Sequence, residues 1–243
     1  MVEQAVSESL EKEVSEFLMQ GIELEGRTLE HSVAIREQSK AKYKQEWLDA
    51  RLQLLAISAH LLNQKNGVPG KTSAQISERL TLIMAFLQGV YATETMISEG
   101  QYIKATAALK QDLEILARIA EVKHHIAKQG RVPNVKYAPE GSQRFYGQLN
   151  DVAHPCNLEL LQSLLRSRHD GEVHGVSYIP TFVEETALGL YELHVWLLFE
   201  AVREHLLLFI EMYGEEDSAM NKVARWTLTA VDTLRRAGFT FTE

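Results

Sequence analysis

Three polar side chains that could do chemistry recur at every fourth position within the stretch FYGQLNDVAHPC, residues 145–156. They are Tyr146, Asn150 and His154, and steps of four place them on one face of a helix. A histidine moves protons near neutral pH, and a hydroxyl and an amide beside it can orient a substrate. The same groups could instead form a buried polar network that locks two helices together, because buried polar groups need partners.

A second polar line stands on the helix that we expect to pack against this one. Residues 101–128 carry apolar side chains on two lines, which is typical of a central helix packed on more than one side. Lys110, Glu114 and Arg118 follow one another at steps of four beside these lines. We expect the Glu114 carboxylate to accept a hydrogen bond from Tyr146 or His154 and so to order the pair of helices.

The elements that position these residues are predicted to be helices. The chain has 243 residues, and its 14 glycines and 5 prolines are few enough to favour long helices over many short strands. Helical patterns of apolar residues cover about residues 4–19, 28–63, 74–98, 101–128, 142–153, 158–168, 181–213 and 218–236. Gly21 and Gly26 are expected to interrupt the first of these, and residues 169–180 to form a loop with a brief extended piece. The predicted fold class is all-α: a helical bundle of about seven or eight helices with an N-terminal helical arm.

The clearest break in the chain is NGVPGKTS at residues 66–73. It separates an N-terminal helical arm, residues 1–66, from a bundle core, residues 67–243, and we expect the two to form one continuous domain. The letters GKT are shared with phosphate-binding loops, but the first glycine is too close to them and no apolar strand precedes. We therefore expect a turn between helices, with Thr72 or Ser73 as the cap of the second one.

The charge of the chain is unevenly placed. Its net charge is −8, and residues 1–30 hold eight glutamates against Lys12 and Arg27, which is −6. An acidic chain argues against a broad DNA-binding surface, while a small local RNA site stays possible. The acidic N-terminal helix has three possible uses: to pack on the body, to dimerise or to bind another protein.

Other features bear on compartment and cofactors. One cysteine and no signal-peptide pattern favour a cytoplasmic protein, and no apolar run is long enough to predict a membrane span. Metal-capable residues gather between positions 154 and 174, but they lack the paired spacing of zinc sites; they are His154, Cys156, His169 and His174. No nucleotide-binding or metallopeptidase motif is present, so we expect no cofactor and no metal.

The order of these elements resembles uncharacterised bacterial all-helical families related to the HEPN superfamily (higher eukaryotes and prokaryotes nucleotide-binding). In those, a helix of the type GQYIKATAALKQDLEILARI precedes a segment of the type YGQLNDVAHP, and a proline and a long helix follow, here Pro180 and residues 181–213. The resemblance covers about residues 90–213. It implies a helical protein that acts through protein–protein contacts, as a homo-oligomer or with another protein, in bacterial stress or phage defence.

Many members of this superfamily are metal-independent ribonucleases. Their signature is an arginine, often followed by Asn or Asp, with a histidine about four to six residues later. The histidine moves the proton of the RNA 2′-hydroxyl, and the arginine stabilises the charged phosphorane. Asn150 and His154 match the polar and histidine positions, but Leu149 stands where the arginine is expected. The resemblance therefore implies a degenerate catalytic motif.

An active ribonuclease is the alternative function. In it, His154 would be the acid or base, Asn150 and Tyr146 would orient RNA, and Arg144, Arg118 or another subunit would supply the missing arginine. Arg144 lies ten residues before His154. The pair Arg168 and His174 also has the spacing of the motif, but glycines beside it argue against a helix there; a loop is the simpler expectation.

Overall fold

The computed structural model describes residues 2–154, 157–169, 172–216 and 218–240. Over these residues the chain forms eight α-helices, one short 3-10 turn and one β-hairpin. The helices are α1 Val2–Lys42, α2 Gln45–Gln64, α3 Ala74–Ser98, α4 Tyr102–Lys123, α5 Gln143–Ala153, α6 Leu158–Leu165, α7 Glu184–Tyr213 and α8 Ser218–Ala237. The 3-10 turn is η1 Val135–Tyr137, and the strands are β1 Arg166–His169 and β2 Glu172–Val176. The predicted all-α bundle is confirmed.

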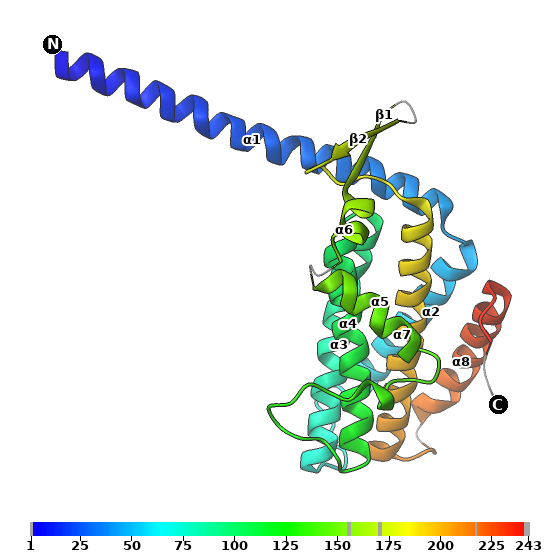
Figure 1. Cartoon of the computed structure of the whole chain (residues 1–243). Coiled ribbons are helices and arrows are strands. Elements are labelled where there is room, and N and C mark those ends of the chain that lie inside the picture. The colour runs from blue at the N-terminus through cyan, green and yellow to red at the C-terminus, as the bar shows by residue number, and fades with distance from the viewer. Residues whose placement is uncertain (1, 155–156, 170–171, 217, 241–243) are drawn as a thin grey trace.

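The core lies between four long helices and is closed by α8. Helix α3 packs against α4 and α7, and α2 packs against α7 and α8 (Figure 1). The largest buried side chains come from all these contacts; they include Leu54, Phe86, Leu113, Tyr191 and Leu197. The apolar seam expected between residues 181 and 213 is thus present on α7, because three- and four-residue steps keep one face of a helix inward.

Helix α1 differs from its expected form. It continues through Gly21 and Gly26 and ends only at Lys42, so the expected interruption near these glycines is wrong. A glycine inside a helix costs about 1 kcal/mol relative to alanine, which does not by itself end a helix. The break falls at Lys44, whose ψ is 136°. There, Tyr43 stacks on Tyr191 with ring centroids 3.9 Å apart, and Ser39 donates to the Ser98 carbonyl oxygen at 2.9 Å.

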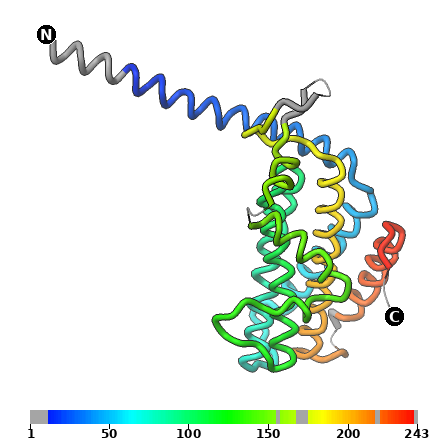
Figure 2. Tube along the Cα trace, viewed as in Figure 1, coloured from blue at the N-terminus to red at the C-terminus, as the bar shows by residue number. Residues whose placement is uncertain are grey.

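The N-terminal part of α1 projects from one end of the bundle (Figure 2). Every side chain from residue 12 to residue 27 is exposed, and the next buried side chain along the helix is that of Ser32. Helix α2 behaves otherwise, because Trp47, Leu54 and Leu61 lie in the same core as the later helices. The division of the chain near residue 66 stays a prediction. We call residues 12–31 of α1, which are exposed except for the half-buried Thr28, the projecting arm.

Two helix ends and one loop also differ from expectation. Helix α4 ends at Lys123 rather than near residue 128, and α6 ends at Leu165 rather than near residue 168. Residues 166–168, expected to end a helix, form β1 instead, and β2 lies in the stretch expected to be a loop with a brief extended piece. The two strands pair as an antiparallel hairpin, with Arg166 opposite Val176 and His169 opposite Glu172. The missed signal is Asp170–Gly171, a pair of residues that the two-residue connections of hairpins favour.

Among the described helices, α3 alone is long and apolar enough to cross a membrane, judged by length and composition. A core helix of a folded bundle meets the same criterion. In this structure Ile83, Phe86 and Val90 of α3 are buried within the bundle, but only 28% of the apolar window of α3 is buried. The expectation that the protein has no membrane partner therefore stays a prediction.

Candidate functional site

The short helix α5 lies along the central helix α4, as the two polar lines of the sequence predict. Leu149 and Val152 are the buried residues of α5, and Phe145 packs against the core beside them. Because these apolar residues fix one arc of α5 against the bundle, the adjoining arc with Tyr146 meets α4 at its solvent edge. The candidate site is the polar contact along this edge, and its members are Lys110, Glu114, Tyr146 and His154.

Tyr146 makes the first of the contacts. Its hydroxyl donates to Glu114 Oε1 at 2.9 Å, which is the hydrogen bond that the sequence predicts for this carboxylate. Burial raises the pKa of the Tyr146 hydroxyl to about 12, and the hydrogen bond to the negatively charged Glu114 adds to this effect. Tyr146 is therefore a hydrogen-bond donor at neutral pH and holds α5 to α4.

Lys110 makes the second contact and joins the histidine to the carboxylate. Its Nζ lies 3.0 Å from His154 Nε2 and 3.9 Å from Glu114 Oε1. It also lies 5.6 Å from the centre of the Tyr146 ring. An ammonium group only donates, so His154 Nε2 accepts in this hydrogen bond and the imidazole is neutral there. The side chain of Lys110 is 15% exposed, whereas His154 is exposed.

The other two predicted site residues, Asn150 and Arg144, do not take part in this side-chain contact. Asn150 is half-buried, and its backbone carbonyl accepts from the His154 N–H at 3.0 Å, which ends α5. Within the described residues no side-chain hydrogen bond joins Asn150 to the other site members. The guanidinium of Arg144 lies 4.6 Å from the centre of the Phe145 ring, at the opposite end of α5 from His154. Tyr146, Glu114 and His154 are brought together with Lys110, and Arg144 is not.

Arg118 is the second arginine considered for the ribonuclease alternative. In the described part of the chain its guanidinium binds other groups and not His154. It donates to the carbonyl oxygens of Lys128 and Arg131 and pairs with Glu121 Oε2 at 2.8 Å. These contacts hold the loop that follows α4. The cation nearest to His154 among the described residues is therefore Lys110, whose role sequence reasoning missed although its spacing from Glu114 was visible.

The arrangement offers a neutral imidazole and an ammonium side by side at the surface. A hydrogen-bonded pair of this kind can bind an anionic group, with the ammonium carrying the charge and the imidazole accepting or returning a proton. The carboxylate of Glu114 lies 3.9 Å from Lys110 Nζ and offsets its charge. The site is thus equally suited to fastening two helices and to holding one anion.

The remaining sequence candidates have structural roles or lie outside the described residues. Ser73 is the N-cap of α3, because its hydroxyl accepts from the Ile76 N–H at 3.1 Å, so the GKT stretch forms the expected turn. Among the described residues no three His, Cys, Asp or Glu side chains form a group that could hold a metal ion. Cys156 lies outside the described residues, and the side chains of Arg168, His169 and His174 are likewise not described.

Comparison with models of protein families, with curated proteins and with solved structures found no match to this chain.

Proposed function

We propose that this protein acts through protein–protein contact, as a HEPN-like helical protein with a degenerate catalytic motif, and that its projecting arm makes the contact. The main support is one observation: the arm has a wide apolar face that nothing in the described chain covers. Its exposed apolar side chains are Val14, Phe17, Leu18, Met19, Ile22, Leu24 and Leu29. A role in bacterial stress or phage defence rests on the resemblance and belongs to this proposal.

The apolar face of the arm continues the face with which α1 meets the bundle. Phe17, Leu24 and Ile35 are seven and eleven residues apart, which is close to two and three turns, so they lie on one side of the helix. Ile35 is buried against the bundle, whereas Phe17 is 72% exposed. In proteins most of the stability of a helix comes from packing its apolar face against another surface. A second protein surface is the simplest means of covering this face.

The occupant that we propose is the body of a second copy of this chain. Two arms side by side would bring together two segments of net charge −3, because residues 12–31 hold five glutamates against Lys12 and Arg27, and this repulsion argues against arm-to-arm pairing. An arm that lies on another copy's body avoids it, and two such contacts related by a two-fold axis would close a dimer.

Sedimentation velocity tests the proposal on four proteins. They are the wild type, the double variant Phe17→Ser/Ile22→Ser, a chain lacking residues 1–26, and the control Gln20→Ser. Gln20 is an exposed polar residue of the arm, so its replacement leaves the apolar face of the arm and the surface of the bundle unchanged. We expect a dimer for the wild type and the control and a monomer for the two arm variants. A monomeric wild type, or arm variants that remain dimeric, would contradict the proposal.

The alternative function, a metal-independent ribonuclease, has one observation in its favour. Lys110 lies 3.0 Å from His154 and supplies a cation where the motif lacks its arginine. Labelled RNA incubated in EDTA with the wild type, His154→Ala, Lys110→Ala and the exposed control Lys104→Ala tests this function. Cleavage by the wild type and the control that is lost in the other two would support the ribonuclease, and no cleavage by any of them would reject it.

A further inference from the structure

A second candidate site lies away from the arm, where the loop after α4 folds back over the helix. It is a pocket of about 450 Å³, and its lining includes Arg118, Lys128, Arg131, Val132, Lys136 and Tyr137. A volume of this size is in the range of small-molecule sites, which is about 300–1,000 Å³. The pocket takes no part in the contact between Lys110 and His154, because α5 begins at this loop and His154 follows its far end.

Two residues of α4, Arg118 and Glu121, hold the loop that forms the pocket, and their opposite charges pair with each other. Arg118 donates to the carbonyl oxygens of Lys128 and Arg131, and it pairs with Glu121. Glu121 Oε1 also accepts from the Asn134 N–H at 2.8 Å. Both groups face main-chain atoms of the loop, so they fix its course and leave its side chains available.

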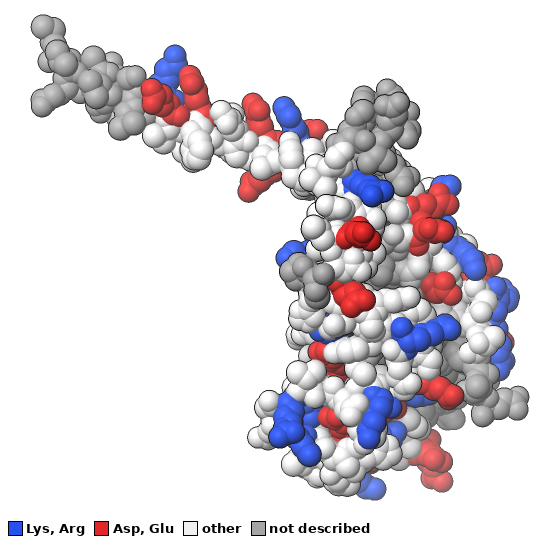
Figure 3. Space-filling model, viewed as in Figure 1, with Lys and Arg blue, Asp and Glu red and all other residues white. Residues whose placement is uncertain are grey.

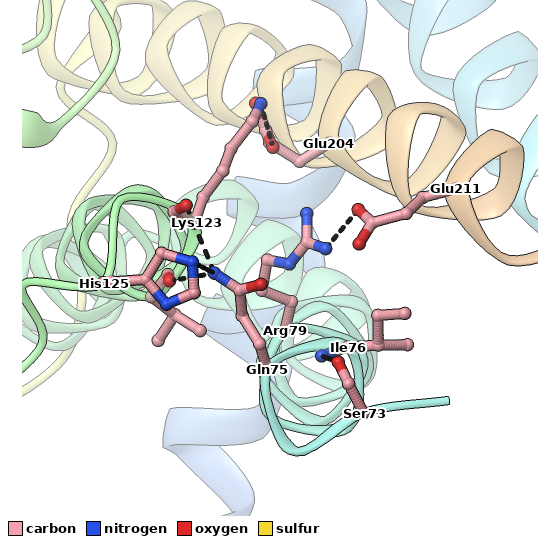
Figure 4. Close-up of polar contacts among 9 residues, drawn as sticks. Ser73, Gln75, Ile76, Arg79, Lys123, His125, Glu204 and Glu211 are labelled. Carbon is pink, nitrogen blue, oxygen red and sulfur yellow. Dashed lines mark hydrogen bonds and ion pairs between the residues drawn. The ribbon is translucent and has the colours of Figure 1, made fainter. Parts of the chain in front are cut away.

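The end of α4 from which the loop departs is also fixed, as Figure 4 shows. Gln75 Nε2 donates to the carbonyl oxygens of Val122 and Lys123, at 2.6 and 3.2 Å. Lys123 pairs with Glu204 of α7 at 3.4 Å. These contacts tie α3, α4 and α7 together at the point where the chain leaves the helix, at His125, whose φ is 57°. The pocket is therefore preformed by the fold.

The charge of this loop is opposite to that of the chain. No acidic residue occurs between Glu121 and Glu140, and four basic residues do: Lys123, Lys128, Arg131 and Lys136. Figure 3 shows Lys and Arg side chains over the loop that follows α4. Within the described residues, no ion pair joins the side chains of Lys128, Arg131 or Lys136 to a carboxylate. Counting Arg118 and Glu121, the pocket carries a net charge of +3 in a chain of −8.

Two of these three cations, Lys128 and Arg131, lie on one turn of the loop. The Arg131 N–H donates to the Lys128 carbonyl oxygen at 3.4 Å, so the two residues are a single turn apart. An arginine fork and a lysine ammonium close together are suited to a doubly charged group with several acceptor oxygens. Val132 is 71% exposed, and Lys136 Nζ lies 4.6 Å from the centre of the Tyr137 ring, so the rest of the pocket offers apolar and aromatic surface.

We propose that this pocket binds a small organic phosphate. The phosphate group lies between Lys128 and Arg131, and the organic part packs against Val132 and Tyr137. Inorganic phosphate alone would leave most of the volume unfilled, and a carboxylate would bring a single charge.

Isothermal titration calorimetry with phenyl phosphate, inorganic phosphate and benzoate tests the proposal on the full chain. We expect phenyl phosphate to bind most tightly, because only this probe has both the double charge and the ring. Arg131→Gln and Lys128→Gln should each weaken its binding by about 10- to 100-fold, the range for a hydrogen bond to a charged group. Lys104→Gln, an exposed lysine near the other end of α4, should leave it unchanged.

The two pocket variants preserve the fold, because Arg118 holds the main-chain carbonyls of Lys128 and Arg131 and not their side chains. Circular dichroism of each variant checks this directly. Phenyl phosphate binding that is absent in the wild type, no tighter than that of benzoate, or unchanged in Arg131→Gln would overturn the proposal. Since none of these probes involves the arm, the result is independent of the sedimentation experiment.

Discussion

The projecting arm and the bundle present the same kind of helix in two different surroundings. Phe17 of the arm and Phe86 of α3 both lie on the apolar face of a long helix, yet Phe17 is 72% exposed and Phe86 is fully buried. The local pattern defines a face in both cases, but only in the bundle do other helices of the same chain cover it (Figure 1). Amphipathic sequence therefore identifies a surface that needs a partner, and the fold decides whether that partner is internal.

The largest expected effect separates these two phenylalanines. Phe86→Ala should lower the free energy of unfolding by about 3–5 kcal/mol, because it leaves a cavity in a packed core. Phe17→Ala should change it by no more than about 0.5 kcal/mol in a monomeric sample, because the ring contacts water before and after unfolding. Urea unfolding at low protein concentration measures both values. Equal losses for the two variants would show that the arm folds back on the bundle in solution.

The next effect concerns titratable groups in the bundle. Burial raises the pKa of Asp112 from 3.8 to about 7 and lowers the pKa of His194 from 6.5 to about 3. Between about pH 4 and 7 the folded chain keeps a proton on Asp112 that the unfolded chain releases, so this group lowers stability as pH rises. Between about pH 3 and 6.5 the unfolded chain binds a proton on His194 that the folded chain does not, so this group lowers stability as pH falls.

These opposed effects are separable by substitution. Asp112→Asn removes the first, so its stability relative to the wild type should rise between pH 4 and 7, by a few kcal/mol at most. The pH dependence of stability that remains in the variant should be that of the buried histidines His194 and His205, since burial also lowers the pKa of His205, to about 4. Urea unfolding of wild type and variant across this pH range gives the difference. A constant difference at every pH would mean that Asp112 is ionised in the fold.

The smallest expected change in the free energy of unfolding concerns the contact of α5 with α4, whose side chains are half-buried. Tyr146→Phe removes the hydrogen bond to Glu114 and should cost about 0.5–1.5 kcal/mol. Tyr91→Phe, at a tyrosine that is 71% exposed, is the matched control and should cost nothing measurable. A double-mutant cycle of Tyr146→Phe with Glu114→Gln isolates the pair. A coupling energy of zero would show that the hydrogen bond between Tyr146 and Glu114 does not stabilise the packing of α5 on α4.

Much of the site was predictable from spacing, and its chemistry was not. Steps of four placed Tyr146, Asn150 and His154 on one helix and Lys110, Glu114 and Arg118 on another, and the bond from Tyr146 to Glu114 follows from their docking. Which partner each residue takes depends on the rotation and offset of α5 on α4, and these are set by Leu149 and Val152 in the core. Hence His154 meets Lys110, and Arg118 turns to the loop.

The sequence by itself determined the all-α class and the inward faces of the helices in the bundle, because periodicity and the scarcity of glycine and proline act over neighbouring residues. It located the break at residues 66–73 and the long seam of α7 for the same reason. Tertiary structure alone decided where α1 ends. Directly after this helix the ring of Tyr43 stacks on the ring of Tyr191, 148 residues later in the chain. It also decided that the arm stays uncovered and that the loop after α4 closes a basic pocket, because both depend on contacts between segments far apart in sequence.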